Sequence, residues 1–190
     1  GPEDHAAARC GQPVRDLEGD RLEHRLELTD PELDRHDGPR RSQMLAHDWL
    51  YPNPNVLTTF LGVHDMERFM NEKGATIEGL KLAQTFIMTT RGTPLLYYGD
   101  EIAMPGGGDP DNRRDFPGGF AGDKTNAFEA AGRTKEQNDV WNHVAKLGAL
   151  RQKYEALRNG KSLDLLDEEQ QSAYVRVLNN QAILMIFNND

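Results

Sequence analysis

The chain has 190 residues, and its 22 basic and 31 acidic residues give a formal net charge of −9 at pH 7. A nonspecific nucleic-acid binder needs basic surface to displace counterions from phosphates, so the acidic balance excludes that class. No apolar run approaches the roughly 18 residues of a membrane span, and the single cysteine, Cys10, excludes an intrachain disulfide and any zinc site built from several cysteines. We therefore expect a soluble chain of one domain, or of one domain with an appendage.

Residues 1–43 differ in composition from the rest of the chain. Residues 1–48 contain no Phe, Trp or Tyr, and charged side chains fill much of this stretch. Such a segment can bury little apolar area, so we expect a loosely packed acidic arm with short surface helices at most. The sequence begins with Gly1 and Pro2 and not with Met, and these two residues resemble those that remain after a protease has removed a tag. The natural protein is therefore expected to begin elsewhere.

Two strands and a helix are predicted between residues 56 and 98. Residues 56–63 (VLTTFLGV) are β-branched, aromatic and nearly continuous, which is typical of a strand covered on both faces. Residues 76–90 carry apolar side chains at helical spacing, and residues 94–98 (PLLYY) form a second short apolar run. Strand, helix and strand in this order predict a βαβ crossover and hence a parallel sheet.

A long loop, a second helix and a hairpin are predicted next. Residues 105–122 hold six Gly and three Pro, and loops of this length are usually functional or disordered. Residues 134–158 carry one apolar stripe and start with a capping-box pattern, so they predict a helix. Residues 173–178 and 182–187 are apolar runs separated by two Asn, which favours an antiparallel hairpin.

Polar side chains follow both predicted strands. His64 and Asp65 come directly after the first strand, and Asp100 and Glu101 come after the second. The carboxyl ends of neighbouring parallel strands lie at the same edge of a sheet. In barrels of parallel strands, the reactive groups lie at this edge. The spacing of these residues is also consistent with a purely structural role. In that interpretation they form surface turns or helix caps, and residues 109–115 form a solvated charge run.

Three segments resemble conserved stretches of one family. FLGVHDMER, GTPLLYYGDEI and GDPDNRRDFPGGF resemble stretches of the alpha-amylase family of glycoside hydrolases, nearest to its cyclomaltodextrinase and neopullulanase branch. The resemblance covers about residues 44–190 and leaves out residues 1–43. It implies an α/β fold in which residues 44–160 form the last two βα units, strands seven and eight, of a TIM (β/α)8 barrel. Residues 161–190 would then begin a C-terminal antiparallel β domain.

The resemblance also implies roles for individual residues. Asp65 matches the third catalytic carboxylate, which stabilises an oxocarbenium-like transition state through the sugar hydroxyls. His64 matches a neighbouring sugar ligand, and Asp109 with Arg113 matches a pair that holds glucose units. Arg68 is a lesser candidate, either structural or facing the substrate. No metal ligand or cofactor is expected from these motifs, and they decide neither calcium binding nor the compartment.

Two departures from the family pattern bear on activity. Val63 stands where the family usually has Asn before His-Asp. The nucleophilic Asp and the general-acid Glu, which lie about 5–5.5 Å apart in a retaining enzyme, have no match upstream. We therefore expect the C-terminal part of an enzyme that cleaves α-1,4-glucosidic bonds in cyclomaltodextrins, maltooligosaccharides or pullulan. Alone, this part is expected to be inactive or nearly so.

Partners and rival functions follow from the same residues. We expect an α-glucan or cyclodextrin ligand, no nucleic acid and no membrane, and self-association or a companion fragment that completes the barrel edge. The alternative function is a non-catalytic carbohydrate-binding or scaffolding module. A metal-dependent phosphohydrolase is disfavoured because its His and Asp ligands would have to lie on helices, whereas His64 follows a strand-like run. A phosphate-binding loop is disfavoured because Asp123 precedes Lys124 where Gly is needed.

Overall fold

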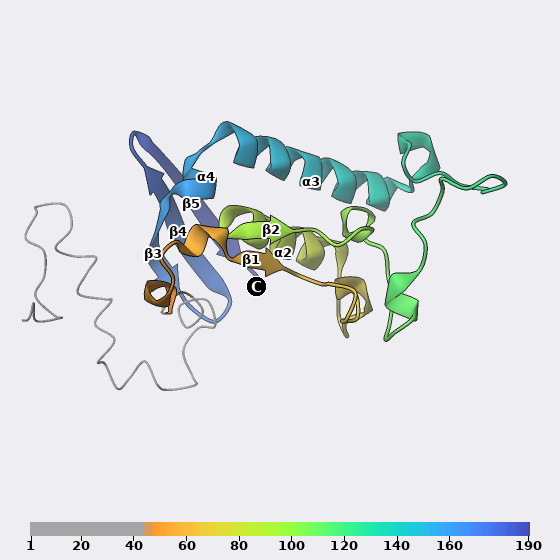
Figure 1. Cartoon of the computed structure of the whole chain (residues 1–190), viewed down its shortest axis with the longest axis horizontal. Coiled ribbons are helices and arrows are strands. Elements are labelled where there is room, and N and C mark those ends of the chain that lie inside the picture. The colour runs from red at the N-terminus through yellow and green to blue at the C-terminus, as the bar shows by residue number, and fades with distance from the viewer. Residues whose placement is uncertain (1–44, 46) are drawn as a thin grey trace, which may run out of the picture. The chain divides into compact units, whose positions relative to one another are not determined.

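The computed structural model describes residue 45 and residues 47–190. The expected acidic arm, residues 1–43, therefore lies outside the described residues. The chain divides into two compact units, residues 1–51 and residues 52–190. In the first unit the described part contains one short 3₁₀ turn, η2 (Asp48–Leu50). The second unit carries the helices and strands that are labelled in Figure 1.

The predicted strand–helix–strand unit is present. Strand β1 (Thr58–Phe60) leads through one short 3₁₀ turn, η4 (Phe69–Asn71), into α2 (Ile77–Thr89), and β2 (Thr93–Leu95) then pairs with β1 in parallel. Helix α2 begins after Thr76, whose Oγ1 accepts a hydrogen bond from the Gly79 amide at 3.0 Å. Gly92 turns the chain into β2 with φ of 108°, and a side chain there would meet the Leu57 carbonyl oxygen at 2.6 Å.

The two strands are shorter than predicted, and one of their faces is exposed. Side chains alternate along a strand, so neighbours point to opposite faces. Leu61 and Leu96 pack against the buried cluster of α2 and α3 (Lys135–Lys153), whereas Phe60 and Leu95 are 45% and 39% exposed. Within the described residues only the helix side of this two-stranded sheet is covered. The expectation of strands covered on both faces is therefore wrong for the part of the chain that the structure describes.

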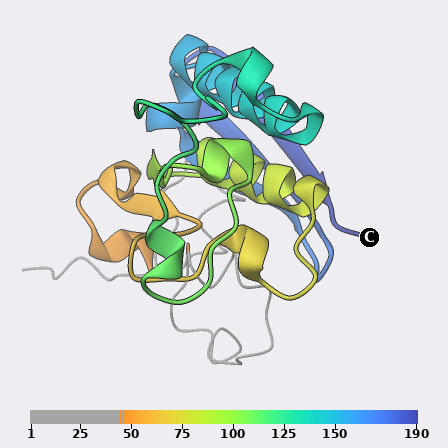
Figure 2. The same cartoon turned by 90° about the vertical axis from the view of Figure 1, so that its right-hand side faces the viewer.

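The helix predicted over residues 134–158 is interrupted near its end. It starts as predicted, with a capping box between Thr134 and Gln137. The chain leaves helical geometry at Tyr154 and resumes as α4 (Ala156–Asn159). Arg158 donates from Nη1 to the Gln152 carbonyl at 2.7 Å, which satisfies an acceptor that the end of α3 leaves free. α2 and α3 lie side by side (Figures 1 and 2).

The chain ends in a three-stranded antiparallel sheet, ordered β3 (Lys161–Asp167), β4 (Gln171–Leu178) and β5 (Gln181–Asn188). The predicted hairpin of β4 and β5 is confirmed, and Asn179 takes the left-handed conformation in its turn. Strand β3 was not predicted, and its ladder with β4 is irregular between Asp164 and Leu166. The inner face buries Tyr174, whose hydroxyl lies 2.8 Å from Thr89 Oγ1 in α2.

Candidate functional site

Four of the residues singled out in the sequence lie together at the surface. His64 and Asp65 follow β1, and Asp109 and Arg113 come from the long loop after β2. Asp65 Oδ1 lies 3.3 Å from His64 Nε2 and 3.7 Å from Arg113 Nη2. Arg113 Nε lies 3.1 Å from Asp109 Oδ1. We call these four residues the surface cluster.

The surface cluster is open to solvent and rich in hydrogen-bonding groups. Its side chains are between 45% and 69% exposed, and they combine two carboxylates, a guanidinium and an imidazole. Ion pairs between exposed side chains are weak, typically about 0–1 kcal/mol. Such groups can therefore exchange partners for a polyhydroxylated ligand, whose hydroxyls both donate and accept hydrogen bonds.

Asn112 lies under the surface cluster and was not singled out in the sequence. It is 1% exposed, and its Nδ2 donates to the His64 and Met66 carbonyl oxygens, both at 2.8 Å. Arg113 Nε also donates to the His64 carbonyl, at 3.1 Å. The loop after β2 thus holds the backbone around Asp65 by direct hydrogen bonds.

Arg68 does not face the surface, in contrast to the substrate-facing alternative considered for it. It is 1% exposed, and its guanidinium donates to the carbonyl oxygens of Asn112 at 2.9 Å and Tyr98 at 2.6 Å. It also stacks on the rings of Tyr97 and Tyr98, 4.5 and 4.7 Å from their centroids. Arg68 therefore connects the end of β2 to the loop that carries Asn112.

The two acidic residues after β2 are not part of the surface cluster. Asp100 is 5% exposed and lies 3.4 Å from Arg68 Nη1. Burial raises the pKa of the Asp100 carboxyl to about 6, although the Arg68 charge acts in the opposite direction. Glu101 accepts a hydrogen bond from the Gly99 amide at 2.7 Å, as the capping interpretation predicted.

Part of the charge run in the long loop is paired within the loop. Arg114 binds the Asp111 carboxylate through two nitrogens, at 2.5 and 2.6 Å, and the Gly107 amide donates to the same group at 2.8 Å. The hydrogen bonds from Arg114 and Gly107 lower the pKa of Asp111. A side chain at Gly106 would meet Asn112 Cα at 2.9 Å, so this close approach requires glycine.

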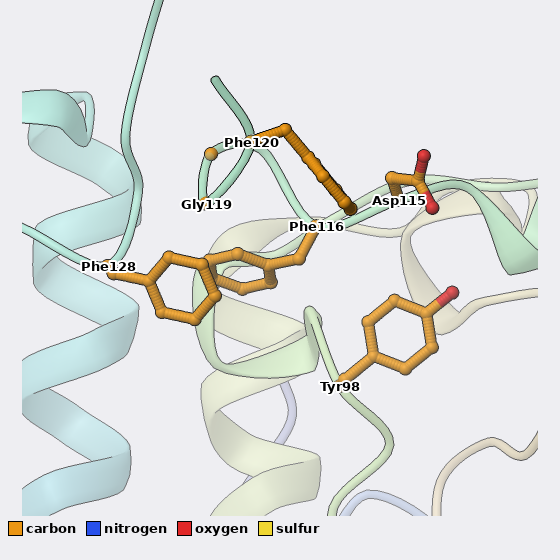
Figure 3. Close-up of a pocket in the computed structure, with 7 residues that line it drawn as sticks. Tyr98, Asp115, Phe116, Gly119, Phe120 and Phe128 are labelled. Atoms are coloured by element: carbon orange, nitrogen blue, oxygen red, sulfur yellow. The ribbon is translucent and has the colours of Figure 1, made fainter. Parts of the chain in front are cut away.

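An open aromatic hollow lies on the same loop (Figure 3). Its lining residues are Tyr98, Asp115, Phe116, Gly118, Gly119, Phe120 and Phe128. The Phe116 and Phe128 rings lie 4.5 Å apart, and Phe120 is 66% exposed. Tyr98 is 39% exposed, and its hydroxyl donates to the Arg114 carbonyl at 2.8 Å.

The described residues contain neither a cluster of metal ligands nor a membrane-spanning helix. No three His, Cys, Asp or Glu side chains in the part of the chain that the structure describes gather where they could hold a metal ion. Among the helices described, none is long and apolar enough to cross a bilayer.

The sequence matches one family model and several characterised proteins. The model of the alpha-amylase catalytic domain matches residues 40–160. A cyclomaltodextrinase of Geobacillus thermopakistaniensis (strain MAS1) is 35% identical over 130 residues, which are 67% of this chain and 20% of that protein. Neopullulanase 2 of Thermoactinomyces vulgaris is 34% identical over 145 residues, 74% of this chain and 22% of that protein. The chain thus spans about a fifth of the length of the relatives that it matches.

The structure also resembles solved structures of similar sequence. The alpha-amylase of Geobacillus thermoleovorans, complexed with acarbose, superposes with a TM-score of 0.64 at 31% identity. The superposition covers 83% of this chain and 33% of that one. The likeness therefore extends over the α/β elements and reaches most of the described residues.

Proposed function

We propose that this chain supplies the sugar-binding residues of a site that cleaves α-1,4-glucans. The chain belongs to the alpha-amylase family of glycoside hydrolases and is similar to its cyclomaltodextrinases. The chain contains part of an alpha-amylase catalytic domain, with α/β elements and a C-terminal antiparallel three-stranded sheet. The substrates that we propose are cyclomaltodextrins, maltooligosaccharides or pullulan.

In the proposed architecture, residues 44–160 supply strands seven and eight of a TIM barrel with their helices, and residues 161–190 begin a β domain. The parallel pairing of β1 with β2 supports this assignment, because barrel strands are parallel. The exposed face with Phe60 and Leu95 gives further support, since the interior of a barrel is filled by such side chains.

The observation that carries the functional proposal is the convergence of Asp65, Asp109 and Arg113. They lie in one chain of ion pairs, although β1 and the long loop are separated by α2 and β2. In the proposed mechanism Asp65 accepts hydrogen bonds from sugar hydroxyls that strengthen as positive charge develops on the ring. His64 donates to the same sugar, and Asp109 with Arg113 holds the neighbouring glucose unit.

A retaining mechanism needs two further carboxylates about 5–5.5 Å apart, one as nucleophile and one as general acid. We propose that a segment other than this chain supplies both, as a companion fragment or as more of the same protein. On this proposal the chain binds glucan but does not cleave it.

Calorimetric titration of maltotriose and β-cyclodextrin, with product analysis of the same samples, tests the proposal. We expect binding without product, and about tenfold weaker binding in Asp65→Asn because the anionic acceptor is lost. Glu72→Gln, at an exposed position outside the four residues of the surface cluster, is the matched control and should bind as the parent chain does. Absence of binding, or hydrolysis that disappears in Asp65→Ala, would contradict the proposal.

The aromatic hollow favours a second candidate, a carbohydrate-binding module that performs no chemistry. Apolar patches on a protein surface often mark interaction sites, and flat aromatic rings offer a platform to the apolar face of a sugar. Phe120→Ala distinguishes the two candidates. Binding that depends on Phe120 and not on Asp65 would favour the binding module, and the reverse would favour the hydrolase part.

A further inference from the structure

We infer that Asn112 is a positioning residue, which fixes the backbone on both sides of Asp65 and thereby aims the Asp65 carboxylate. The inference rests on the proposed function, because it assigns a task to Asn112 in that same site. Asn112 carries no charge and is almost fully buried, so it does not touch the sugar itself.

The geometry is specific to a side-chain amide. An Asn amide nitrogen carries two hydrogens, and here Nδ2 donates to two carbonyl oxygens, those of His64 and Met66, both at 2.8 Å. These carbonyls belong to the residues directly before and after Asp65. One side chain therefore holds the backbone at two points that flank the proposed catalytic residue.

Asn112 is itself held by a hydrogen bond from Arg68. Its backbone carbonyl accepts a hydrogen bond from Arg68 Nε at 2.9 Å, and the Arg68 amide donates to the Gly106 carbonyl at 2.9 Å. Arg68 is in turn fixed by the Tyr98 carbonyl at 2.6 Å and by the Asp100 carboxylate at 3.4 Å. The turn with Asp65 is thus connected through Asn112 and Arg68 to the segment after β2 that carries the buried Asp100.

The exposed ion pairs of Asp65 cannot replace this support. His64 and Arg113 are both largely solvent-exposed, and pairs of this kind contribute little and are screened by salt. The Asn112 hydrogen bonds are partly buried, and Asn112 itself is shielded from water, so they are stronger electrostatically than the exposed ion pairs and their loss leaves unsatisfied groups. In Asn112→Asp the shape is retained, but an oxygen faces two carbonyl oxygens where the donor stood.

The test uses the 190-residue chain and the variant Asn112→Asp, with NMR order parameters of the Asp65 and Met66 amides and calorimetric titration of maltotriose. We expect the order parameters of these two amides to fall from about 0.85 to below about 0.6. We also expect maltotriose affinity to fall about tenfold, which corresponds to the loss of about one hydrogen bond in the site. If Asn112→Asp does not fold, Asn112→Ala, which removes the donor without repulsion, takes its place.

Two controls separate positioning from general destabilisation. Asn142→Asp makes the same chemical change on an exposed part of α3, and Val140→Ala removes buried volume from the same helix. Both should keep the parent order parameters at Asp65 and the parent affinity, even where Val140→Ala unfolds at a lower temperature.

Each outcome decides the inference. Unchanged order parameters at Asp65 and Met66 in the Asn112 variant, or unchanged affinity in a parent chain that binds, would overturn it. If the parent chain does not bind maltotriose, the proposed function fails for this chain. The order parameters then decide alone whether Asn112 fixes the turn.

Discussion

Asp65 Oδ1 lies 3.7 Å from Nη2 of Arg113, which joins the turn after β1 to the long loop after β2. Both side chains are exposed, and the backbone next to them is held by partly buried hydrogen bonds from Asn112. The arrangement therefore combines exposed polar side chains that can change partners with a backbone that is held in place. This is the arrangement expected of a site that must exchange water for sugar without moving its backbone.

Arg113 should be needed for sugar binding but not for folding. Its guanidinium reaches Asp65, Asp109 and the His64 carbonyl at once, which the point charge of Lys cannot reproduce. We expect Arg113→Lys and Arg113→Ala to weaken maltotriose binding about tenfold each, with a free energy of unfolding within about 1 kcal/mol of the parent. Calorimetry and urea denaturation measure the two quantities. Lys146→Ala, on the exposed side of α3, should change neither.

Asp100 should make stability depend on pH. Its pKa is raised by burial from 3.8 to about 6, so between these values the folded state keeps a proton that the unfolded chain releases. The free energy of unfolding, compared with that of Asp100→Asn, is therefore highest at acid pH. It should fall by roughly 3 kcal/mol as the pH rises through this window and level off above about pH 7.

Denaturant titrations of both proteins at several pH values check this expectation. Asp139→Asn is a control of opposite sign, because the hydrogen bond from Lys81 lowers the pKa of Asp139. Its contribution is present above the unfolded pKa and is lost as the pH falls. A difference between parent and Asp100→Asn that stays constant with pH would show that Asp100 is not protonated on folding.

The capping box of α3 should contribute measurably to stability. Thr134 Oγ1 accepts from the Gln137 amide at 3.2 Å, and the Gln137 side chain accepts from the Thr134 amide at 2.9 Å. Thr134→Ala removes one of these partners and should lower the free energy of unfolding by about 1 kcal/mol. Thr134→Ser should recover most of it, and Thr125→Ala in the exposed loop should have little effect. Equal stabilities of the Ala and Ser variants would argue against the cap.

The exposed face of β1 and β2 should drive self-association. Phe60 and Leu95 are register partners in the parallel pair, and both are more than a third exposed. Contiguous apolar surface of this kind favours association. Sedimentation velocity should show oligomers that dissociate at least tenfold more readily in the double variant Phe60→Glu with Leu95→Glu. Ala145→Glu, at an exposed position of α3, is the control, and a monomeric parent chain at all concentrations would contradict the expectation.

The order of the elements could be predicted because apolar runs and their breakers are local signals. Thr76, Gly92 and the capping box of α3 act on the chain around them, and each lies where the sequence placed a boundary. The break at Tyr154 could not be predicted by spacing. Tyr154 and Leu157 both pack into the core under the C-terminal sheet, so the apolar stripe continues through the interruption.

The site was predictable where the family motifs carry charged residues, and not where the contact is tertiary. His64, Asp65, Asp109 and Arg113 were singled out, and they lie in one chain of ion pairs. Their roles toward a sugar stay predictions. Asn112 was overlooked because it is uncharged, and its two hydrogen bonds depend on how the long loop folds back. The burial of Arg68 likewise depends on the aromatic rings at the end of β2.

Chemical-shift mapping of the isotope-labelled chain with maltotriose tests the central claim most directly. We predict that amide signals of His64, Asp65, Asp109 and Arg113 shift with one common affinity, while signals of β3 and β5 stay in place and no glucose or maltose appears. Shifts confined to the aromatic hollow or to the C-terminal sheet would contradict it. Release of sugar products by the chain alone would contradict it as well.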